Sequence, residues 1–128
     1  MNRILVDTSI WISFFKGDNC AKPLQSMIES NLICTNELIL AEMIPSLEYQ
    51  NEDHLINLLH HVELQKISID WNGIIDMQVK NLRNGINRVG LPDLIIAQNA
   101  IHYESLLFTL DKHFRLMSKY FRLKLYQQ

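Results

Sequence analysis

Short apolar runs alternate along the chain with segments of helical periodicity. The runs that predict strands are 4–6, 32–35, a weaker 64–68, 106–110 and 123–126. The segments between them space their apolar residues as one face of a helix does. They predict helices over 19–30, 36–49, 51–62, 70–85, 91–105 and 111–121. Proline followed by an acid opens the segment 91–105, which is a characteristic helix start.

This alternation predicts an α/β fold with a central parallel sheet that is covered by helices on both faces. Because crossovers between parallel strands are right-handed, few topologies remain. We expect a doubly wound sheet in which the first and fourth strands are adjacent, with ligands bound at the carboxyl ends of the strands. No internal repeat, low-complexity segment or linker interrupts the chain, so residues 1–128 are expected to form one domain.

Carboxylates fall at the predicted carboxyl edge of this sheet. Asp7 ends the first strand and Asp111 ends the fourth, and neighbouring strands lie ~5 Å apart. Asp93 occupies the first turn of the helix leading to the fourth strand, and that helix begins at the same edge. Glu42 lies ~10 Å along the helix after the second strand and can lean back toward the edge. Four acids from separate segments are therefore expected to converge.

Each acid alone also has an ordinary explanation. Asp7 and Asp111 precede helices and could be N-caps, Asp93 could interact with a helix dipole, and Glu42 could be an exposed helix residue. Together, however, such carboxylates repel each other unless a cation lies among them. A ligand set made only of oxygen indicates Mg²⁺ or Mn²⁺ rather than zinc. Metals held in this way activate water for phosphodiester hydrolysis.

The composition, with 48% hydrophobic and 20% charged residues, is that of an ordinary globular protein. Its net charge of −2 is unevenly distributed. Residues 1–76 carry eleven acids and four bases, whereas residues 77–128 carry eight bases and three acids. Two interpretations stay open: a face that binds a polyanion, or a set of solvated helix faces.

Several protein classes are disfavoured. No apolar run is long enough to cross a bilayer, and Asp7 and Lys16 interrupt the apolar N-terminus without a cleavage site after it, which argues against a secretory signal. Cys20 and Cys34 show no metal or redox spacing. We therefore expect reduced cysteines and a cytoplasmic location.

Four sequence motifs together carry a family resemblance. They are ILVDTSIWI with Asp7, ICTNELILAEM with Glu42, LPDLIIAQNA with Asp93 and LLFTLDKHF with Asp111. In this order and spacing the chain resembles PIN-domain ribonucleases, and among them the VapC-like toxins of toxin–antitoxin pairs. The resemblance implies a three-layer α/β/α, PIN-like fold with strand order 3-2-1-4-5. It also implies a Mg²⁺-dependent endoribonuclease that cleaves RNA to 3′-hydroxyl and 5′-phosphate ends, frequent homodimers, and silencing by a small antitoxin protein.

Carried over to this chain, the resemblance assigns roles to individual residues. The catalytic metal ligands would be Asp7, Glu42, Asp93 and Asp111. The residues that would orient these carboxylates are Thr8 or Ser9 and Thr109. Apart from the resemblance, the basic C-terminal half of the chain offers Arg83, Arg88, Lys112 and Arg115 to hold the RNA backbone; solvated surface is the other interpretation of Arg83 and Arg88. Many relatives carry a further acid just after the fourth one, where this chain has His113 and Arg115. We therefore expect one firmly bound ion rather than two.

Other functions are also compatible with parts of the pattern. A non-catalytic RNA- or protein-binding module could use the same fold, and it would bind RNA without Mg²⁺-dependent cleavage. A phosphatase of the haloacid-dehalogenase type also places Asp at the end of the first strand, but it requires an acid where Ser9 stands. The histidines have no HExxH-like pairing, which disfavours a zinc site or a histidine-activated nucleophile; they are His54, His60, His61, His102 and His113.

Overall fold

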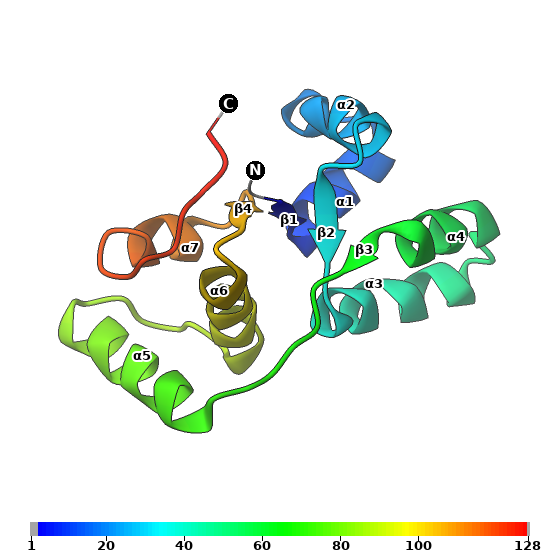
Figure 1. The fold of residues 1–128 in the computed structure, drawn as a ribbon. Helices are drawn as coiled ribbons and strands as arrows, with labels where there is room; N and C mark the ends of the chain where they lie inside the picture. Colours follow the sequence, from blue (N-terminus) through cyan, green and yellow to red (C-terminus); the bar gives the residue numbers. More distant parts are fainter. Residues whose placement is uncertain (1–2, 128) are drawn as a thin grey trace.

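A parallel sheet forms the centre of the molecule in a computed structural model that describes residues 3–127 (Figure 1). Within those residues the sheet has four strands in the order β3-β2-β1-β4. The strands are β1 Ile4–Val6, β2 Ile33–Thr35, β3 Glu63–Leu64 and β4 Leu106–Phe108. All three pairings are parallel. The predicted fold class, an α/β protein with a central parallel sheet, is confirmed.

Helices flank this sheet and supply every crossover between its strands (Figure 1). They are α1 Thr8–Phe15, α2 Pro23–Glu29, α3 Glu37–Tyr49, α4 Asp53–His61, α5 Trp71–Arg83, α6 Leu91–Tyr103 and α7 Lys112–Met117. The predicted helix over 19–30 is divided into a 3₁₀ turn, η1 Asn19–Ala21, and α2. Pro23 stands in the first turn of α2, where the missing N–H of proline costs nothing, whereas a continuous helix would need that donor.

The segment predicted as a fifth strand, 123–126, lies beside β4 but forms only an isolated bridge. Leu125 pairs with Leu107 in the parallel sense. Leu107 N donates to Lys124 O at 2.8 Å and Tyr126 N donates to Leu107 O at 2.9 Å. The segment thus occupies the outer side of β4, as strand order 3-2-1-4-5 requires, without forming a strand. The predicted strands over 64–68 and 106–110 are likewise shorter than expected.

The register of β1 against β4 places their carboxyl ends side by side. Val6 pairs with Phe108, and Asp7 N donates to Phe108 O at 3.0 Å. The chain leaves β1 into α1 through Asp7 and leaves β4 toward α7 through Thr109. These two exits therefore meet at one edge of the sheet, as predicted for neighbouring first and fourth strands.

The hydrophobic core lies between the sheet and the helices. The largest side chains that are fully buried include Trp11 on α1, Leu94 on α6 and Phe114 on α7. Burial of one such side chain stabilises a fold by about 1.5–3 kcal/mol. Because these helices also carry or adjoin the predicted site acids, the same packing fixes the positions of the acids. None of the described helices is long and apolar enough to span a membrane.

A buried polar network joins the start of α3, the residue that follows β3, and α6. Asn36 caps α3 by accepting from Ile39 N at 2.9 Å, and its side-chain amide donates to Asn99 Oδ1 at 3.0 Å. The amide of Gln65 donates to the same Asn99 oxygen at 3.0 Å and to Ser105 Oγ at 3.1 Å. Buried amides in such a network are costly to disrupt because each would lose its partners out of contact with water. The network therefore fixes α3, which carries Glu42, relative to α6.

Candidate metal centre

Asp7 is a buried carboxylate that is oriented by two hydroxyl groups. Its side chain retains 6% of its accessible surface. Ser9 Oγ and Thr109 Oγ1 both donate to Asp7 Oδ2, each at 2.8 Å. Within the described residues no hydrogen bond to Oδ1 and no basic partner for Asp7 occurs. The helix-cap explanation does not apply to Asp7, since it precedes α1 without any side-chain cap bond. A buried carboxylate with only neutral partners favours a cation beside it.

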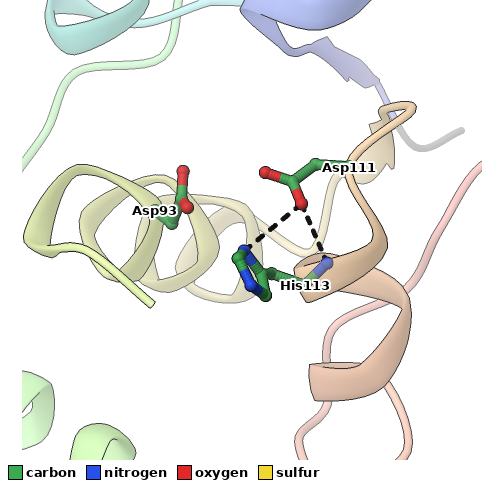
Figure 2. A group of neighbouring side chains, drawn as sticks. All are labelled: Asp93, Asp111 and His113. Atoms are coloured by element: carbon green, nitrogen blue, oxygen red, sulfur yellow. Dashed lines mark hydrogen bonds and ion pairs between the residues drawn. The ribbon is translucent and has the colours of Figure 1, made fainter. Parts of the chain in front are cut away.

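Asp111 does cap its helix, and the cap brings His113 to the same place. Asp111 Oδ1 accepts a 2.9 Å hydrogen bond from His113 N, at the start of α7. His113 Nδ1 lies 3.4 Å from the same oxygen. The other Asp111 oxygen points toward Asp93, as Figure 2 shows. One carboxylate oxygen thus holds the helix, which leaves the second directed into the space between α6 and α7.

Asp93, in the first turn of α6, faces Asp111 and His113 across that space (Figure 2). One donor atom from each of these three side chains lies within 4.8 Å of the others. The pKa of Asp93 is raised from 3.8 to about 6. Burial is the largest cause, followed by the negative charges of Asp111 and Asp7. His113 lowers this pKa and Glu42 raises it further. The acids therefore act on one another electrostatically.

Glu42, on α3, is exposed at the margin of this group. Its Oε1 accepts a 3.0 Å hydrogen bond from Thr8 Oγ1, in the first turn of α1. The structure therefore places each hydroxyl residue singled out from the sequence against a carboxylate: Thr8 against Glu42, and Ser9 and Thr109 against Asp7. Because such bonds restrict the rotamers of the acids, they preorganise the donors for a cation.

The donor set fits a hard divalent cation. It contains carboxylates with unused oxygens, a carboxyl group whose pKa is raised first by burial and then by its acidic neighbours, and a buried acid without a basic partner in the described part of the chain. A bound ion of charge +2 would relieve this repulsion. No thiolate lies in the group. Burial raises the pKa of the Cys34 thiol to about 12, so that thiol is no candidate nucleophile at neutral pH.

His113 is the residue that sequence reasoning left out. The ligand set predicted from the sequence contains only oxygen donors, because the histidines have no metal-binding spacing to one another in sequence. His113 instead joins two acids, of which Asp93 is distant in sequence. The signal available in the sequence was its position two residues after Asp111, since a capped first turn holds residue i+2 close to the capping side chain.

The four basic residues expected to hold RNA are all exposed. Arg83 ends α5, and Arg88 precedes α6 in a left-handed conformation with φ of 65°. Lys112 and Arg115 lie on α7, directly after Asp111. Arg115 also lines a pocket of about 430 Å³ together with Thr109 and Tyr126. No acid among the described residues forms a salt bridge with any of these four.

Comparison with known proteins identifies the family. Residues 4–120 match the PIN domain family. Because this match covers most of the chain, the protein belongs to the PIN domain family, as the motifs predicted. A sequence search of curated proteins gave no match.

Solved structures share the fold at low sequence identity. A chain of VapBC2 from Rickettsia felis, bound to a DNA fragment from their promoter, has a TM-score of 0.75 at 20% identity, covering 98% of both chains. A chain of DNA-bound VapBC from Salmonella typhimurium has a TM-score of 0.73 at 16% identity, also covering 98% of both. A chain of VapBC-1 from nontypeable Haemophilus influenzae has a TM-score of 0.72 at 20% identity, covering 97% of this chain and 96% of that one.

Proposed function

We propose that this PIN-domain protein is a Mg²⁺-dependent endoribonuclease, in which Mn²⁺ can replace Mg²⁺. The observation that supports the proposal is the acidic rim near the ends of β1 and β4: donor atoms of Asp93 and Asp111 lie within 4.8 Å of each other, and the charges of Asp7 and Glu42 also act on Asp93. The three aspartates would hold the ion, and Glu42 would complete its shell directly or through water. When bound, such a cation activates water and stabilises the charge of a phosphodiester under attack.

The residues of the chain have separate tasks in this proposal. Ser9 and Thr109 hold the buried Asp7 carboxylate in one orientation, and Thr8 does the same for Glu42. Arg83, Arg88, Lys112 and Arg115 contact phosphates of the RNA on either side of the bond that is cut. Contacts of this type position a strand and supply affinity, but they select little sequence.

We further propose that the protein is the toxin of a toxin–antitoxin pair and is silenced by a small antitoxin protein in the cytoplasm. Support comes from the shared fold with chains of VapBC structures. It also comes from a groove of about 400 Å³ between α1, α3 and α4. Apolar side chains including Ile12, Phe15 and Leu55 line this groove, and Thr8 and Glu42 lie in its wall. A helix of the antitoxin bound there would reach the acidic rim.

A homodimer is proposed as well. Its support is an apolar stripe on α5, formed at helical spacing by Trp71, Ile75, Val79 and Leu82, all of which are exposed. Exposed apolar surface of this extent on one helix is typical of a protein–protein contact. Sedimentation analysis of the wild type and of a Trp71→Lys, Leu82→Lys variant tests this part separately.

The decisive experiment for the activity is incubation of purified protein with total RNA in Mg²⁺ and in excess EDTA. Discrete fragments with 3′-hydroxyl and 5′-phosphate ends, formed only with Mg²⁺ and absent for the Asp93→Asn variant, support the proposal. RNA binding without cleavage in Mg²⁺ would favour the non-catalytic module instead. Cleavage that continues in EDTA would contradict a metal-dependent mechanism.

A further inference from the structure

We propose that His113 supplies a nitrogen ligand to the metal centre and thereby shifts its preference from Mg²⁺ toward Mn²⁺. This inference rests on the proposed metal-binding function, which it extends by naming a donor and the class of cation that the donor favours. The site would then be a mixed oxygen and nitrogen site rather than a site of carboxylates alone.

The geometry points to this role. Donor atoms of Asp93, Asp111 and His113 all lie within 4.8 Å of one another. Opposite ligands of an octahedral ion with bonds of about 2.1 Å are about 4.2 Å apart, so one ion can touch all three with small side-chain adjustments. Figure 2 shows the imidazole beside the two carboxylates, with one ring nitrogen directed at Asp111. Among the described residues this is the one group of potential metal-binding side chains, and His113 is its nitrogen donor.

The local backbone keeps the imidazole there. The cap bond from His113 N to Asp111 Oδ1 places His113 in the first turn of α7, with its side chain on the Asp111 side. The side chain of His113 is 24% exposed, compared with 33% for Asp111. In the absence of metal, a protonated imidazole in this position pairs with Asp111, and with metal bound the neutral imidazole is free to coordinate the ion. Partial exclusion of water suits a ligand.

The preference for the cation follows from the nature of the donor. Mg²⁺ is small and hard, takes oxygen ligands almost exclusively and gives up water reluctantly. Imidazole nitrogen is a ligand for divalent transition metals, and among these the affinity is lowest for Mn²⁺ and rises through Fe²⁺ and Co²⁺. Mn²⁺ is therefore the transition metal for which the gain over Mg²⁺ is smallest, and a measurable gain for Mn²⁺ is a strict test of the nitrogen ligand. Replacing one oxygen ligand or water by His113 therefore stabilises bound Mn²⁺ more than bound Mg²⁺. The preference between Mn²⁺ and Mg²⁺ then depends on the single side chain of His113.

The test compares Mn²⁺ and Mg²⁺ binding by the wild type, His113→Asn and His113→Asp. Affinities are measured by electron paramagnetic resonance of Mn²⁺ and by competition with Mg²⁺, without reference to RNA cleavage. His60→Asn is the matched control, since His60 is exposed on α4. We expect His113→Asn to weaken Mn²⁺ binding by about tenfold and Mg²⁺ binding much less. His113→Asp should bind Mg²⁺ more tightly than His113→Asn does, with a smaller gain for Mn²⁺. The His60→Asn control should bind both ions as the wild type does.

Electron spin-echo modulation of the bound Mn²⁺ gives the most direct readout, because a coordinated imidazole imposes ¹⁴N frequencies on the signal. We expect these frequencies in the wild type and in His60→Asn and their loss in the folded His113 variants. Bound Mn²⁺ without ¹⁴N modulation in the wild type overturns the inference and leaves the acidic site intact. Failure of the wild type to bind either cation would instead refute the metal-binding function itself.

Discussion

Thr109 Oγ1, at the end of β4, donates a 2.8 Å hydrogen bond to Oδ2 of Asp7, at the end of β1. The same hydroxyl oxygen accepts from Asp111 N at 3.0 Å. One threonine thus connects two of the proposed metal ligands across neighbouring strands. Asp7 directly follows β1 and Thr109 directly follows β4, so this contact is fixed where two paired strands end. A carboxylate oriented in this way suits a preorganised metal site.

Thr109→Val should therefore damage both stability and metal binding. The change keeps the shape of the side chain but leaves Asp7 and Asp111 N each short of a partner, at a cost of about 1–3 kcal/mol in the free energy of unfolding. We also expect Mg²⁺ affinity to fall by about tenfold. Denaturant unfolding and a Mg²⁺ titration measure the two effects.

Thr35→Val is the matched control for that substitution. Thr35 ends β2 and is fully buried, and its hydroxyl has no hydrogen-bond partner among residues 3–127. Loss of an unpaired buried hydroxyl should leave stability unchanged or raise it. If Thr35→Val lowers the free energy of unfolding as much as Thr109→Val does, loss of the hydrogen bond to Asp7 is not the cause of the destabilisation by Thr109→Val.

Asparagine substitutions separate helix capping from metal binding. Asn caps a helix about as well as Asp, so Asp111→Asn should keep the bond to His113 N and the fold. Without metal, Asp7→Asn and Asp111→Asn should each be as stable as the wild type or more stable, because a repelling charge is gone. Added Mg²⁺ should raise the melting temperature of the wild type, since an ion that binds only the folded state stabilises it.

Asp7→Asn and Asp111→Asn should show little of this Mg²⁺-dependent increase in melting temperature. Asp70→Asn serves as the control, because Asp70 precedes α5 without a side-chain cap bond and is not among the charges that shift the pKa of Asp93. A full Mg²⁺ response in Asp7→Asn would remove Asp7 from the ligand set. Thermal unfolding in Mg²⁺ and in EDTA provides the comparison.

The raised pKa of Asp93 predicts an unusual dependence of stability on pH. The pKa is about 6 in the folded protein without metal and near 3.8 when unfolded. Between these values the folded state binds more protons from this group than the unfolded state, so this contribution to stability falls as pH rises. Asp93→Asn should lack that contribution. The difference in unfolding free energy between variant and wild type, followed from pH 3.8 to above 6, checks the sign.

Binding of Mg²⁺ should follow the opposite trend, since the ion requires ionised Asp93. Affinity should increase as pH rises through about 6. Equal pH profiles of metal-free stability for the wild type and Asp93→Asn would contradict the raised pKa of Asp93.

RNA binding should depend on the basic side chains near the acids and on salt. Replacing Arg88 or Lys112 by Gln should weaken RNA binding and flatten its dependence on salt concentration. The same change at Lys22 or Lys66, which are also exposed, should have a smaller effect. Filter binding with Asp93→Asn, in which cleavage is blocked, isolates affinity from turnover. Equal losses for both pairs would mean that the uneven charge of the chain has no role in holding RNA.

Much of this architecture can be predicted because local signals and topology rules agree. Short apolar runs and helical periodicity locate most of the elements, the crossover rule leaves few topologies, and the doubly wound arrangement among them places β1 beside β4. That adjacency brings Asp7 and Asp111 together from opposite ends of the chain. Asp93 is in the first turn of a crossover helix, and the direction of that helix places its first turn at the same edge of the sheet.

The remaining features depend on tertiary contacts that no local pattern encodes. The segment 123–126 has strand-like residues, but a strand forms only where several successive pairs are made, and here one bridge forms at Leu125. The place of His113 depends on the cap at Asp111 and on the docking of α7 against α6. The choice between Ser9 and Thr8 as the partner of Asp7 is likewise decided by side-chain geometry: Ser9 contacts Asp7, whereas Thr8 contacts Glu42.

The most direct test of the central claim is a crystal structure of the wild type grown with Mn²⁺, with anomalous diffraction used to locate the ion. We predict one anomalous peak at the ends of β1 and β4, about 2.1 Å from a carboxylate oxygen of each directly bound aspartate. Asp7, Asp93 and Asp111 should all contact it directly or through one water. A fully occupied peak elsewhere, or a rim without any peak at saturating Mn²⁺, would contradict the assignment of these carboxylates as a metal centre.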